Sequence, residues 1–485
     1  MVHHPASPCL VWFRDDLRLS DHPALHAAAA TGRPVICLYV LDETSRSPGA
    51  RPLGGAARWW LAQSLRALEK RLGAAGVPLV LRQGDAAAII AEVARASGAS
   101  DVFWNEIAQA PHEFLARHVA AALNDIGIPS QSFPGDLLAS PETIRTKDGR
   151  GLRVFTPFWR RVQAMGRPHE PLPAPQHLQA GPELAGETVE SLRLEPRQPD
   201  WAGGLRATWK AGEEAAQQRL HDFLEEGLSG YAGDRDRPDR DGTSRLSPHL
   251  RFGEASPRQV WQAAQFAAAE RPALSGDADK FLSELGWREF CRHLLFDVPD
   301  LATRNLRPSF DAFPWRHDDA ALTAWQRGQT GYPIVDAGMR QLWHTGVMHN
   351  RVRMVAASFL VKHLLVDWRE GEKWFWDTLV DADPANNPAN WQWVAGCGAD
   401  AAPYFRIFNP VLQGEKFDPH GAYVRRWVPE LASLPANLIH KPWEASPIEL
   451  ASANVALGRD YPLPIIDHRR GRERALKAYE KVRAG

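Results

Sequence analysis

The first 130 residues alternate short apolar runs with longer stretches of helical period, and this alternation constrains the fold more than any other feature. The runs have the length of buried strands, and the stretches between them have the length of helices. Strands are expected at 9–14, 34–41, 77–82 and 101–104, and helices at 56–72, 86–96 and 112–126. This order predicts an α/β fold with a doubly wound parallel sheet, which binds ligands outside the carboxyl ends of its strands.

Residues 131–200 separate this region from the rest of the chain and are rich in proline. Proline fixes φ and removes a backbone donor, so we expect a connector with little helix or sheet, part of which packs against the protein. From residue 201 the pattern is helical: Ser247-Pro248 and Ser256-Pro257 each predict a capping serine before a helix, and 468–483 predicts a final basic helix. The expected parts are an α/β domain at 1–130, a connector at 131–200 and an all-helical domain at 201–485.

Composition excludes several classes of protein. The chain has 485 residues, of which 44% are hydrophobic and 24% charged, as in globular domains. It has no apolar run of about 18 residues and no signal-peptide pattern, so neither a membrane helix nor secretion is expected. The cysteines Cys9, Cys37, Cys291 and Cys397 lie far apart, which argues against a disulfide framework and favours a reducing cytoplasm. Net charge is -1, so nucleic-acid binding would have to depend on local patches.

Tryptophan is the unusual residue, with 19 Trp against 7 Tyr. A tryptophan-rich helical core is one explanation, and redox or stacking chemistry of the indole rings is the other. Trp59, Trp60, Trp343 and Trp443 are expected to be core residues.

Two polar and aromatic motifs stand in the first part of the helical region. The segment 242–248 (GTSRLSP), preceded by Gly230-Tyr231, gathers hydroxyls and N–H groups beside a helix start, which suits an anion. Simple helix capping explains it equally well. The segment 284–289 (ELGWRE) places Glu284, Trp287 and Arg288 on one helical face. A solvated ion pair beside a half-buried indole is the alternative there.

Two further motifs follow. In 348–354 (MHNRVRM), Asn350, Arg353 and Met354 share a helical face, although Met more often fills a core. The segments 367–372 (DWREGE) and 381–393 (DADPANNPANWQW) crowd carboxylates and amides beside a tryptophan pair, with helix capping as the alternative. No His stands at ligand spacing, so no metal is expected. The GxGxxA match at 396–401 follows a helical stretch instead of a strand, which argues against a dinucleotide fingerprint.

Taken in this order, the motifs resemble the photolyase/cryptochrome family, and most closely the microbial cyclobutane pyrimidine dimer photolyases. The resemblance begins at 11–18 (VWFRDDLR), is densest from 244 to 417, includes 401–410 (AAPYFRIFNP) and covers nearly the whole chain. It implies an N-terminal α/β antenna domain and a C-terminal all-helical domain that holds a U-shaped FAD.

The resemblance implies a flavin site in the helical region. The diphosphate and ribityl chain would be held by Tyr231, Thr243, Ser244, Arg245, Leu246 and Ser247. Asn350, Asp381 and Asp383 would contact flavin and adenine. Arg353 would pair with Asp381 beside the isoalloxazine ring, and Asn387 would face flavin N5. Arg288 and Phe281 complete the set, the latter at a position where related enzymes often have Trp.

The same resemblance implies roles in catalysis and DNA binding. Trp391, Trp368 and Trp315 match the family's electron-transfer triad, which reduces photoexcited flavin. Reduced FAD then passes an electron to a pyrimidine dimer flipped out of DNA, and the electron returns after the ring opens. The dimer-binding set would be Glu284, Trp287, Asn350, Met354 and Trp393, with Glu284 hydrogen-bonding the dimer and the indoles stacking on its bases. Arg351 and Arg235 would contact phosphates.

Four rivals differ from this prediction at identifiable positions. A cryptochrome-type blue-light receptor would be expected to have an extended tail and an acid or cysteine in place of Asn387. A (6-4) photolyase would favour histidine at Asn350, and a DASH-type protein would carry Tyr at Trp393. A flavin oxidoreductase on a Rossmann scaffold would need the missing phosphate fingerprint.

The resemblance leaves the antenna chromophore open. Folate-binding relatives place Glu near the position of Gln109, so methenyltetrahydrofolate is the first expectation, with 8-hydroxy-5-deazaflavin, another flavin or none as alternatives. The expected partner is UV-damaged DNA, single- or double-stranded. The protein is expected to be a cytoplasmic monomer that does not bind a membrane.

Overall fold

The computed structural model describes residues 7–44, 49–401 and 405–484, so residues 402–404 of the motif at 401–410 lie outside the described part. The chain divides into two units. Unit 1 contains Met1–Ser229 and Ser244–Asp300, and unit 2 contains Gly230–Thr243 and Leu301–Gly485. Each unit is described by itself below.

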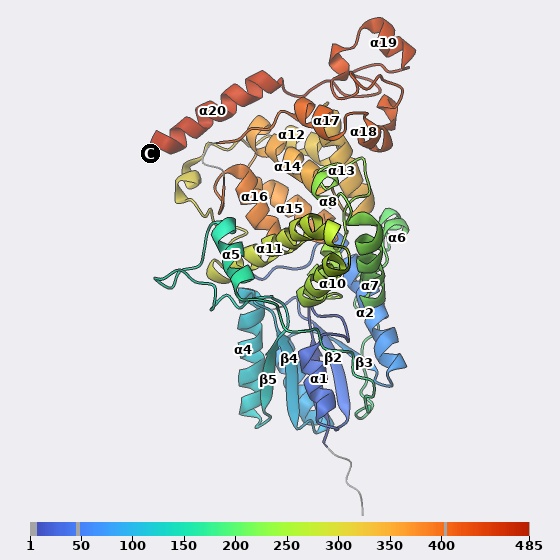
Figure 1. Ribbon diagram of the computed structural model, residues 1–485, viewed down its shortest axis with the longest axis vertical. Coiled ribbons are helices and arrows are strands. Elements are labelled where there is room, and N and C mark those ends of the chain that lie inside the picture. Colours follow the sequence, from blue (N-terminus) through green and yellow to red (C-terminus); the bar gives the residue numbers. More distant parts are fainter. Residues whose placement is uncertain (1–6, 45–48, 402–404, 485) are drawn as a thin grey trace, which may run out of the picture. The chain divides into compact units, whose positions relative to one another are not determined.

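Unit 1 is built on a parallel sheet of five strands in the order β3-β2-β1-β4-β5 (Figure 1). The strands are β1 (Cys9–Phe13), β2 (Val35–Leu41), β3 (Leu79–Gln83), β4 (Asp101–Glu106) and β5 (Ser130–Pro134). Every residue of β1 and β2 is buried, as expected for central parallel strands covered on both faces. The strand order reverses between β1 and β4, and open parallel sheets bind ligands at the carboxyl ends of the strands at such a point.

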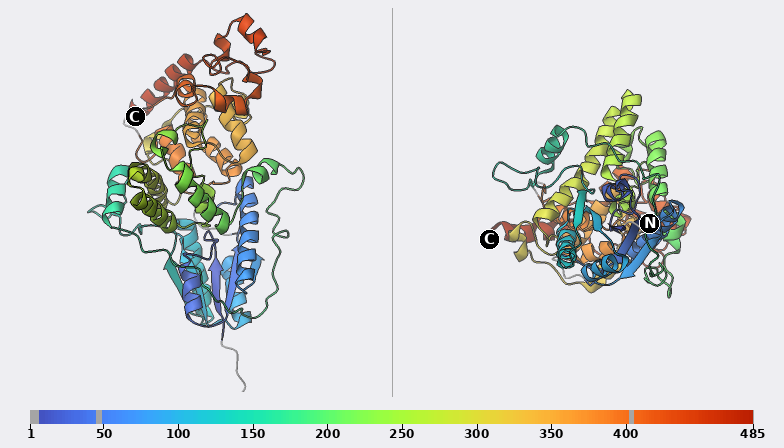
Figure 2. Two further views of the ribbon diagram at one scale, coloured as in Figure 1. Left: turned by 45° about the vertical axis from the view of Figure 1, so that its right-hand side comes forward. Right: turned by 90° about the horizontal axis from the view of Figure 1, so that it is seen from below.

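Helices cover both faces of this sheet (Figures 1 and 2). They are α1 (Pro23–Ala30), α2 (Gly55–Ala74), α3 (Ala86–Ser97) and α4 (Ala110–Asp125). Side chains alternate along a strand, so Leu10 and Trp12 share one face and pack with Ile90 of α3 and Leu123 of α4 in one apolar cluster. The remaining α-helices of unit 1 are α5 (Phe155–Ala164), α6 (Gly203–Thr208), α7 (Glu213–Asp222), α9 (Ser247–Arg251), α10 (Pro257–Glu270) and α11 (Ser275–Asp297).

The regular elements that the structure describes in unit 2 are helices. Its α-helices are α8 (Tyr231–Asp234), α12 (Asp319–Gln326), α13 (Pro333–Thr345), α14 (Asn350–Ser358), α15 (Trp368–Thr378), α16 (Asn386–Ala395), α17 (Pro410–Phe417), α18 (Ala422–Trp427), α19 (Pro447–Ser452) and α20 (His468–Ala484). A π-helical turn, η4 (Phe359–Leu364), continues α14. None of the helices described in either unit is long and apolar enough to cross a bilayer.

Most elements expected from the sequence are confirmed within a few residues. The α/β fold class, the parallel sheet and the all-helical region are present. The expectation of little regular structure in 131–200 is wrong at two places: the strand β5, which was not expected, extends to Pro134, and α5 forms at 155–164. An apolar stripe with helical spacing (i, i+3, i+4 and i+7) is formed by Phe155, Phe158, Trp159 and Val162. A prediction based on the proline content of the segment does not detect it.

The two serine–proline helix starts have different outcomes. Ser256 caps α10 in a capping box with Gln259, as expected. Ser247 is the first residue of α9 and does not cap it; Leu246 occupies the capping position and makes no side-chain bond. The tryptophan assignments also divide: Trp59 and Trp60 are buried, Trp443 is half-buried, and Trp343 is 61% exposed, so its placement in the core is wrong.

Candidate functional site

A buried ion pair joins α14 to the segment before α16 in unit 2. The Arg353 guanidinium donates from Nη2 to both oxygens of Asp381, at 2.9 and 3.1 Å, and from Nε to the carbonyl of Met348 at 2.7 Å. Asp381 is 9% exposed. The pairing expected from the sequence is therefore confirmed, and it fixes the position of the Arg353 guanidinium.

The two neighbouring polar residues expected at the flavin lie in the same region. Asp383 accepts from the backbone N–H groups of Ala385 and Asn386 at 2.8 and 2.7 Å, so it also serves as a capping carboxylate at the start of α16. Asn387 donates from Nδ2 to Oε1 of Glu372, at 2.8 Å, and to the Glu372 carbonyl. Because Nδ2 is engaged in this way, Asn387 Oδ1 is oriented as an acceptor. Glu372, 1% exposed, is a supporting residue that the sequence analysis missed although it lies within a quoted motif.

Helix α14 begins with the third group of candidates. His349 caps it by accepting from Arg351 N through Nδ1, at 3.2 Å. Burial lowers the pKa of His349 to about 4, so the neutral ring carries its proton on Nε2, a buried N–H without a partner among the described residues. Arg351 pairs with Asp236 at 2.6 Å and lies over the ring of Phe417 at 4.4 Å.

Asn350, the first residue of α14, is exposed, and Met354 is half-buried. They lie one turn apart on the helix, as the sequence predicts.

The three tryptophans of the expected relay differ in burial. Trp391 is 2% exposed, makes edge contact with Phe375 at 5.0 Å, and has an indole N–H without a partner in the described part of the chain. Trp368 is fully buried and donates to Asn305 Oδ1 at 2.9 Å. Trp315 is half-buried and packs on Phe313 at 4.3 Å. An electron-transfer path from the surface to the interior requires one indole that reaches solvent and further indoles that are buried, and these three side chains have that distribution.

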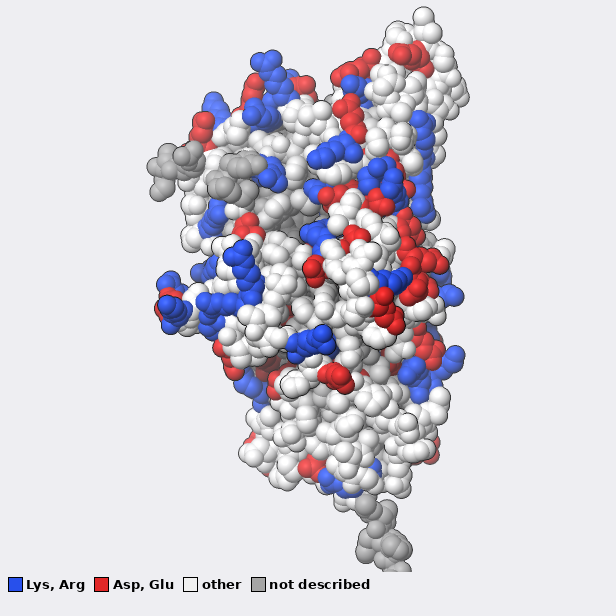
Figure 3. All heavy atoms as spheres, viewed as in Figure 1, with Lys and Arg blue, Asp and Glu red and all other residues white. Residues whose placement is uncertain are grey.

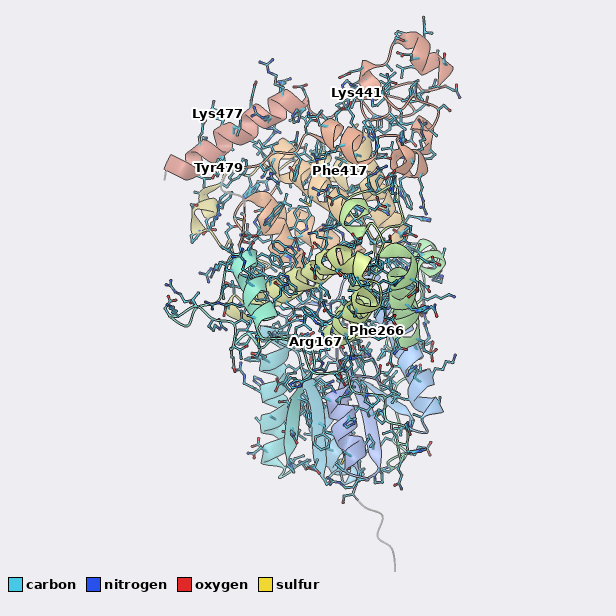
Figure 4. The ribbon with its side chains drawn as sticks, in the orientation of Figure 1. Arg167, Phe266, Phe417, Lys441, Lys477 and Tyr479 are labelled. Carbon is cyan, nitrogen blue, oxygen red and sulfur yellow. The ribbon has the colours of Figure 1, made fainter. Side chains whose placement is uncertain are left out.

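Trp393 lines a small pocket of unit 2. Its indole N–H donates to the Asp400 carbonyl at 3.1 Å, and its pocket neighbours include Lys362, Phe405 and Tyr479, the last of which lies on α20 (Figure 4). Phe405 and Tyr479 stack at 4.5 Å. Half-buried beside these rings, Trp393 keeps part of its surface open to solvent.

In unit 1, α11 carries the expected dimer-binding residues Glu284 and Trp287. The two lie three residues apart, and Glu284 pairs with Lys280 at 3.0 Å. The Trp287 ring stacks on Phe155 of α5 with centroids 3.8 Å apart and planes within 6°. Phe155 thus fixes the orientation of Trp287, a role that the sequence analysis missed.

Arg288 and Phe281 of α11 are buried, whereas Glu284 and Trp287 are half-buried. Arg288 belongs to a buried ion cluster: it donates to Asp136 at 2.7 Å and to Glu289 at 3.0 Å. Arg292 joins the same cluster, and the two guanidinium groups hold the pKa of Asp136 below its usual value against the cost of burial. Phe281 is 6% exposed and packs on Phe223 at 4.7 Å.

The residues expected at the diphosphate are divided between the units. Tyr231 is buried in α8, with the Arg235 guanidinium 6.0 Å from its ring, and both belong to unit 2 with Thr243. The other four, Ser244, Arg245, Leu246 and Ser247, belong to unit 1. Arg245 has φ +50°, so the chain turns sharply immediately before α9.

These observations fit a large polar aromatic ligand such as FAD in unit 2. Buried N–H groups are almost always bonded, so the donors on His349 and Trp391, which have no partner among the described residues, are available to acceptors of a ligand. The nearby Arg353–Asp381 pair and Asn387 Oδ1 add charged and polar contacts. No cluster of His, Cys, Asp or Glu suited to a metal ion occurs within the described ranges.

Comparison with known proteins gives matches along almost the full chain. A family model described as DNA photolyase matches residues 9–176, and one described as the FAD binding domain of DNA photolyase matches residues 281–481. A deoxyribodipyrimidine photo-lyase of Agrobacterium fabrum is 52% identical, covering 98% of each chain. Cryptochrome-1 of Arabidopsis thaliana is 39% identical over 94% of this chain and 68% of its own. The crystal structure of a bacterial class III photolyase from Agrobacterium tumefaciens superposes with a TM-score of 0.95 at 51% identity, covering 99% of this chain and 98% of the other. The chain therefore belongs to the photolyase/cryptochrome family.

Proposed function

We propose that this protein is a light-dependent DNA-repair lyase that splits cyclobutane pyrimidine dimers with reduced FAD. One geometric observation carries the proposal: Asn387 and Trp391 lie one turn apart on the same face of α16. The amide expected at flavin N5 is therefore adjacent to the first indole of the expected relay. The likeness of the whole chain to an enzyme named deoxyribodipyrimidine photo-lyase supports the same reaction.

In unit 2 the residues that would hold the cofactor are Tyr231, Thr243, Asn350, Arg353, Asp381, Asp383 and Asn387. When bound, reduced FAD would supply light-driven electron transfer to the dimer. Asn387 Oδ1 would accept a hydrogen bond from the N5–H of the reduced ring. Arg353, held by Asp381, would keep a guanidinium near the ring and favour its anionic form.

Trp391, Trp368 and Trp315 would deliver the electron that reduces the cofactor before repair begins. Indole is a feasible one-electron donor, whereas the aliphatic side chains of the core are not. The hydrogen bond from Trp368 to Asn305 holds the middle ring in one orientation. The half-buried Trp315 would exchange electrons with reductants in solution.

The remaining residues would bind the lesion. In unit 1, Trp287 would stack on a flipped base, a contact of about 1–3 kcal/mol, and Glu284 would hydrogen-bond the dimer. In unit 2, Trp393 offers a further ring face, Met354 would pack on the dimer, and Asn350 would bind its polar edge. Arg351 and Arg235 would bind phosphate. Asp236 and Phe417 pre-orient the Arg351 guanidinium for this role.

An antenna chromophore in the α/β region is part of the proposal. Gln109 follows β4, at the edge of the sheet where ligands bind, and is fully buried with neither amide atom bonded among the described residues. A buried amide with two open positions suits a polar ring. Methenyltetrahydrofolate is the first candidate, followed by 8-hydroxy-5-deazaflavin or another flavin. A cytoplasmic location and a monomeric state stay predictions.

The test uses purified chain and an oligonucleotide with one thymine dimer. Absorption spectra and chromophore extraction identify FAD and any antenna, and chromatography measures restored thymines after blue illumination and in darkness. We expect repair only in the light. Flavin photoreduction without repair would favour the receptor function of a cryptochrome, and NAD(P)H-dependent turnover in darkness would favour an oxidoreductase.

A further inference from the structure

An amide that lies outside every motif quoted above contacts the middle indole of the proposed relay. Asn305 is 2% exposed, and its Oδ1 accepts a hydrogen bond from the indole N–H of Trp368 at 2.9 Å. Trp368 itself is fully buried. An indole has one N–H, so the chemistry of Asn305 decides whether Trp368 can lose that proton.

A second hydrogen bond fixes which end of the amide faces the indole. Asn305 Nδ2 donates to Oδ1 of Asp311 at 2.6 Å. Asp311 is an exposed residue of η3, a short 3-10 helix (Pro308–Ala312). Because a carboxylate accepts and does not donate, Nδ2 must point to Asp311 and Oδ1 to Trp368. The two bonds form a chain from the indole through the amide to a carboxylate at the surface.

Helix α16 holds the backbone on both sides of Asn305. Gln392 of this helix is fully buried, and its Nε2 donates to the carbonyls of Leu301 and Arg304, both at 2.8 Å. The Oε1 atom of the same side chain accepts from the backbone N–H of Leu306 at 2.9 Å. With these three bonds in place, the segment keeps the amide directed at Trp368.

The acidity of an indole changes when the ring gives up an electron. The neutral indole N–H is a very weak acid, whereas the indole radical cation readily gives its N–H proton to water or to a carboxylate. An amide oxygen accepts a hydrogen bond but is too weak a base to take that proton. Transfer through the amide to Asp311 would require the much less stable imidic-acid tautomer. Trp368 can therefore be oxidised without losing its proton.

The charge beside Trp368 acts in the same direction. The guanidinium of Arg369 lies 4.7 Å from the centroid of the Trp368 ring and pairs with Asp367 at 3.1 Å. A guanidinium near the ring opposes positive charge on it, although the paired carboxylate reduces the effect. Positive charge on the middle indole is therefore neither removed by proton loss nor favoured by this neighbour.

The outer indole has different surroundings. Trp315 is half-buried and packs on Phe313 at 4.3 Å, so part of its surface reaches solvent. Nearby, α20 contacts η3 through Tyr479 and Phe310, whose ring centroids are 6.1 Å apart. Figure 3 shows acidic and basic side chains intermixed over α20. A proton released at this surface of unit 2 therefore meets water and carboxylates.

We propose that Asn305 keeps the indole of Trp368 protonated while it carries positive charge, so that the charge moves on and the proton is lost at Trp315. Asn305 acts through Trp368 and is therefore a positioning residue. The inference rests on the proposed function, because it concerns the relay that reduces the cofactor.

The electrons and protons of this step balance. Trp391 gives one electron to the photoexcited flavin, Trp368 replaces it, and Trp315 replaces the electron of Trp368. The first two indoles end neutral and unchanged. The Trp315 radical cation loses its N–H proton to water and becomes a neutral radical. A thiol in solution restores it by giving one electron and one proton.

The test exchanges the two ends of the hydrogen-bonded chain. The double variant Asn305→Asp with Asp311→Asn places a carboxylate on the indole N–H and an amide behind it, with the net charge and the number of hydrogen bonds conserved. Asp311→Asn alone is the matched control, because it keeps the amide on Trp368. Flash excitation of the FAD-loaded proteins, in H2O and in D2O, follows the radical cation and the neutral radical of tryptophan by their different visible absorption bands.

The double variant should form the neutral radical at least about 100-fold faster than the wild type, since a positioned base typically accelerates proton transfer by that factor or more. Its lasting photoreduction should fall, because the radical is trapped one step closer to the flavin. Asp311→Asn should match the wild type in rate and in D2O effect. Urea unfolding checks that all variants are folded, and Asn305→Asp alone supplies the same carboxylate if the double variant does not bind FAD.

Two results would overturn the inference. One is a carboxylate variant, folded and loaded with FAD, that forms the neutral radical at the wild-type rate. The other is a neutral radical in Trp315→Phe that forms as fast as in the wild type, since it would show that Trp368 loses its proton beside Asn305. Trp368→Phe tests the relay itself and should block photoreduction. If it does not, the proposed relay fails; if it does while a carboxylate variant behaves as wild type, only this inference fails.

Discussion

At the residue scale, the site depends on a few buried groups whose partners fix their orientation. Arg353 is held by Asp381, Asn387 by Glu372, and Trp368 by Asn305. The sequence predicts the first of these pairs, because a resemblance over ordered motifs transfers residue by residue. It does not predict Glu372 or Asn305, whose roles arise from helix packing between α15 and its neighbours.

Replacing Trp391 should separate cofactor reduction from repair. Trp391→Phe removes the indole one helical turn from Asn387, so photoreduction of oxidised flavin should be blocked, whereas protein reduced chemically beforehand should repair at the wild-type rate. Absorption at the flavin bands during illumination measures the first quantity, and thymine release measures the second. Trp59→Phe, in the core of unit 1, is the control and should retain photoreduction. Loss of repair in pre-reduced Trp391→Phe with FAD bound would contradict the separation of roles.

At the element scale, close helix contacts set the positions of the functional rings. Helices α15 and α16 meet at Gly371, where a Cβ would lie 2.2 Å from Cη2 of Trp391. Helices α5 and α11 meet at Gly286 and at the Phe155–Trp287 stack. Helical spacing in the sequence predicts each of these helices. The residues that flank a glycine in the sequence do not show which aromatic ring will pack against it in the folded protein.

The contact between Gly371 of α15 and the Trp391 ring predicts the effect of Gly371→Ala. The added methyl group must displace the Trp391 ring, because the glycine lies in a helix whose backbone cannot yield easily. We expect a loss of about 1–3 kcal/mol in the free energy of unfolding and slower photoreduction. Urea unfolding and flavin absorption measure the two effects. Gly276→Ala in α11 is the control, since open space surrounds that position, and it should be neutral or stabilising. Wild-type stability in Gly371→Ala would show that the packing at Trp391 is looser than described.

The second contact predicts that Phe155→Leu weakens binding of damaged DNA. Leucine keeps most of the apolar volume but loses a ring pair worth about 0.5–1.5 kcal/mol, so affinity for the dimer should fall about two- to ten-fold. Affinity for undamaged duplex should change less, because the phosphate contacts remain. Phe266→Leu provides the control, since Phe266 is 62% exposed (Figure 4). An equal loss on both duplexes would show that Phe155 does not act through Trp287.

At the scale of the whole molecule, burial of ionisable groups ties stability to pH. His293 in unit 1 and His363 in unit 2 are buried, and burial lowers their pKa to about 4 and about 3 from an ordinary value of 6.5. Between the lowered pKa of each folded-state histidine and the ordinary value of 6.5, the unfolded chain binds more protons than the folded chain. Stability therefore decreases as the pH falls below about 6.5.

We expect each of these histidines to cost about 1–2 kcal/mol of stability on going from about pH 7 to about pH 5. Urea unfolding at both pH values measures the total. His293→Gln keeps a donor for the Ala139 carbonyl, which His293 contacts at 3.0 Å, and should reduce the pH dependence. His169→Gln, at an exposed position, should leave it unchanged. An unaltered pH dependence in His293→Gln would mean that this ring is not held neutral by the fold.

The sequence predicts the fold class and the order of elements because strand and helix periods differ strongly in the first 130 residues. It fails at α5, where proline-rich flanks mask a short aromatic stripe, and at Trp343, whose exposure depends on tertiary packing.

In the proposed reaction, reduced FAD transfers an electron to the dimer and receives it back after the ring opens. Repair therefore consumes light and no reducing equivalents. The most direct test illuminates chemically pre-reduced protein under anaerobic conditions, without further reductant, with excess dimer-containing oligonucleotide. The account predicts many dimers split per protein molecule, with the flavin still reduced at the end. Repair that stops after about one dimer per protein, with the flavin oxidised in step, would contradict it.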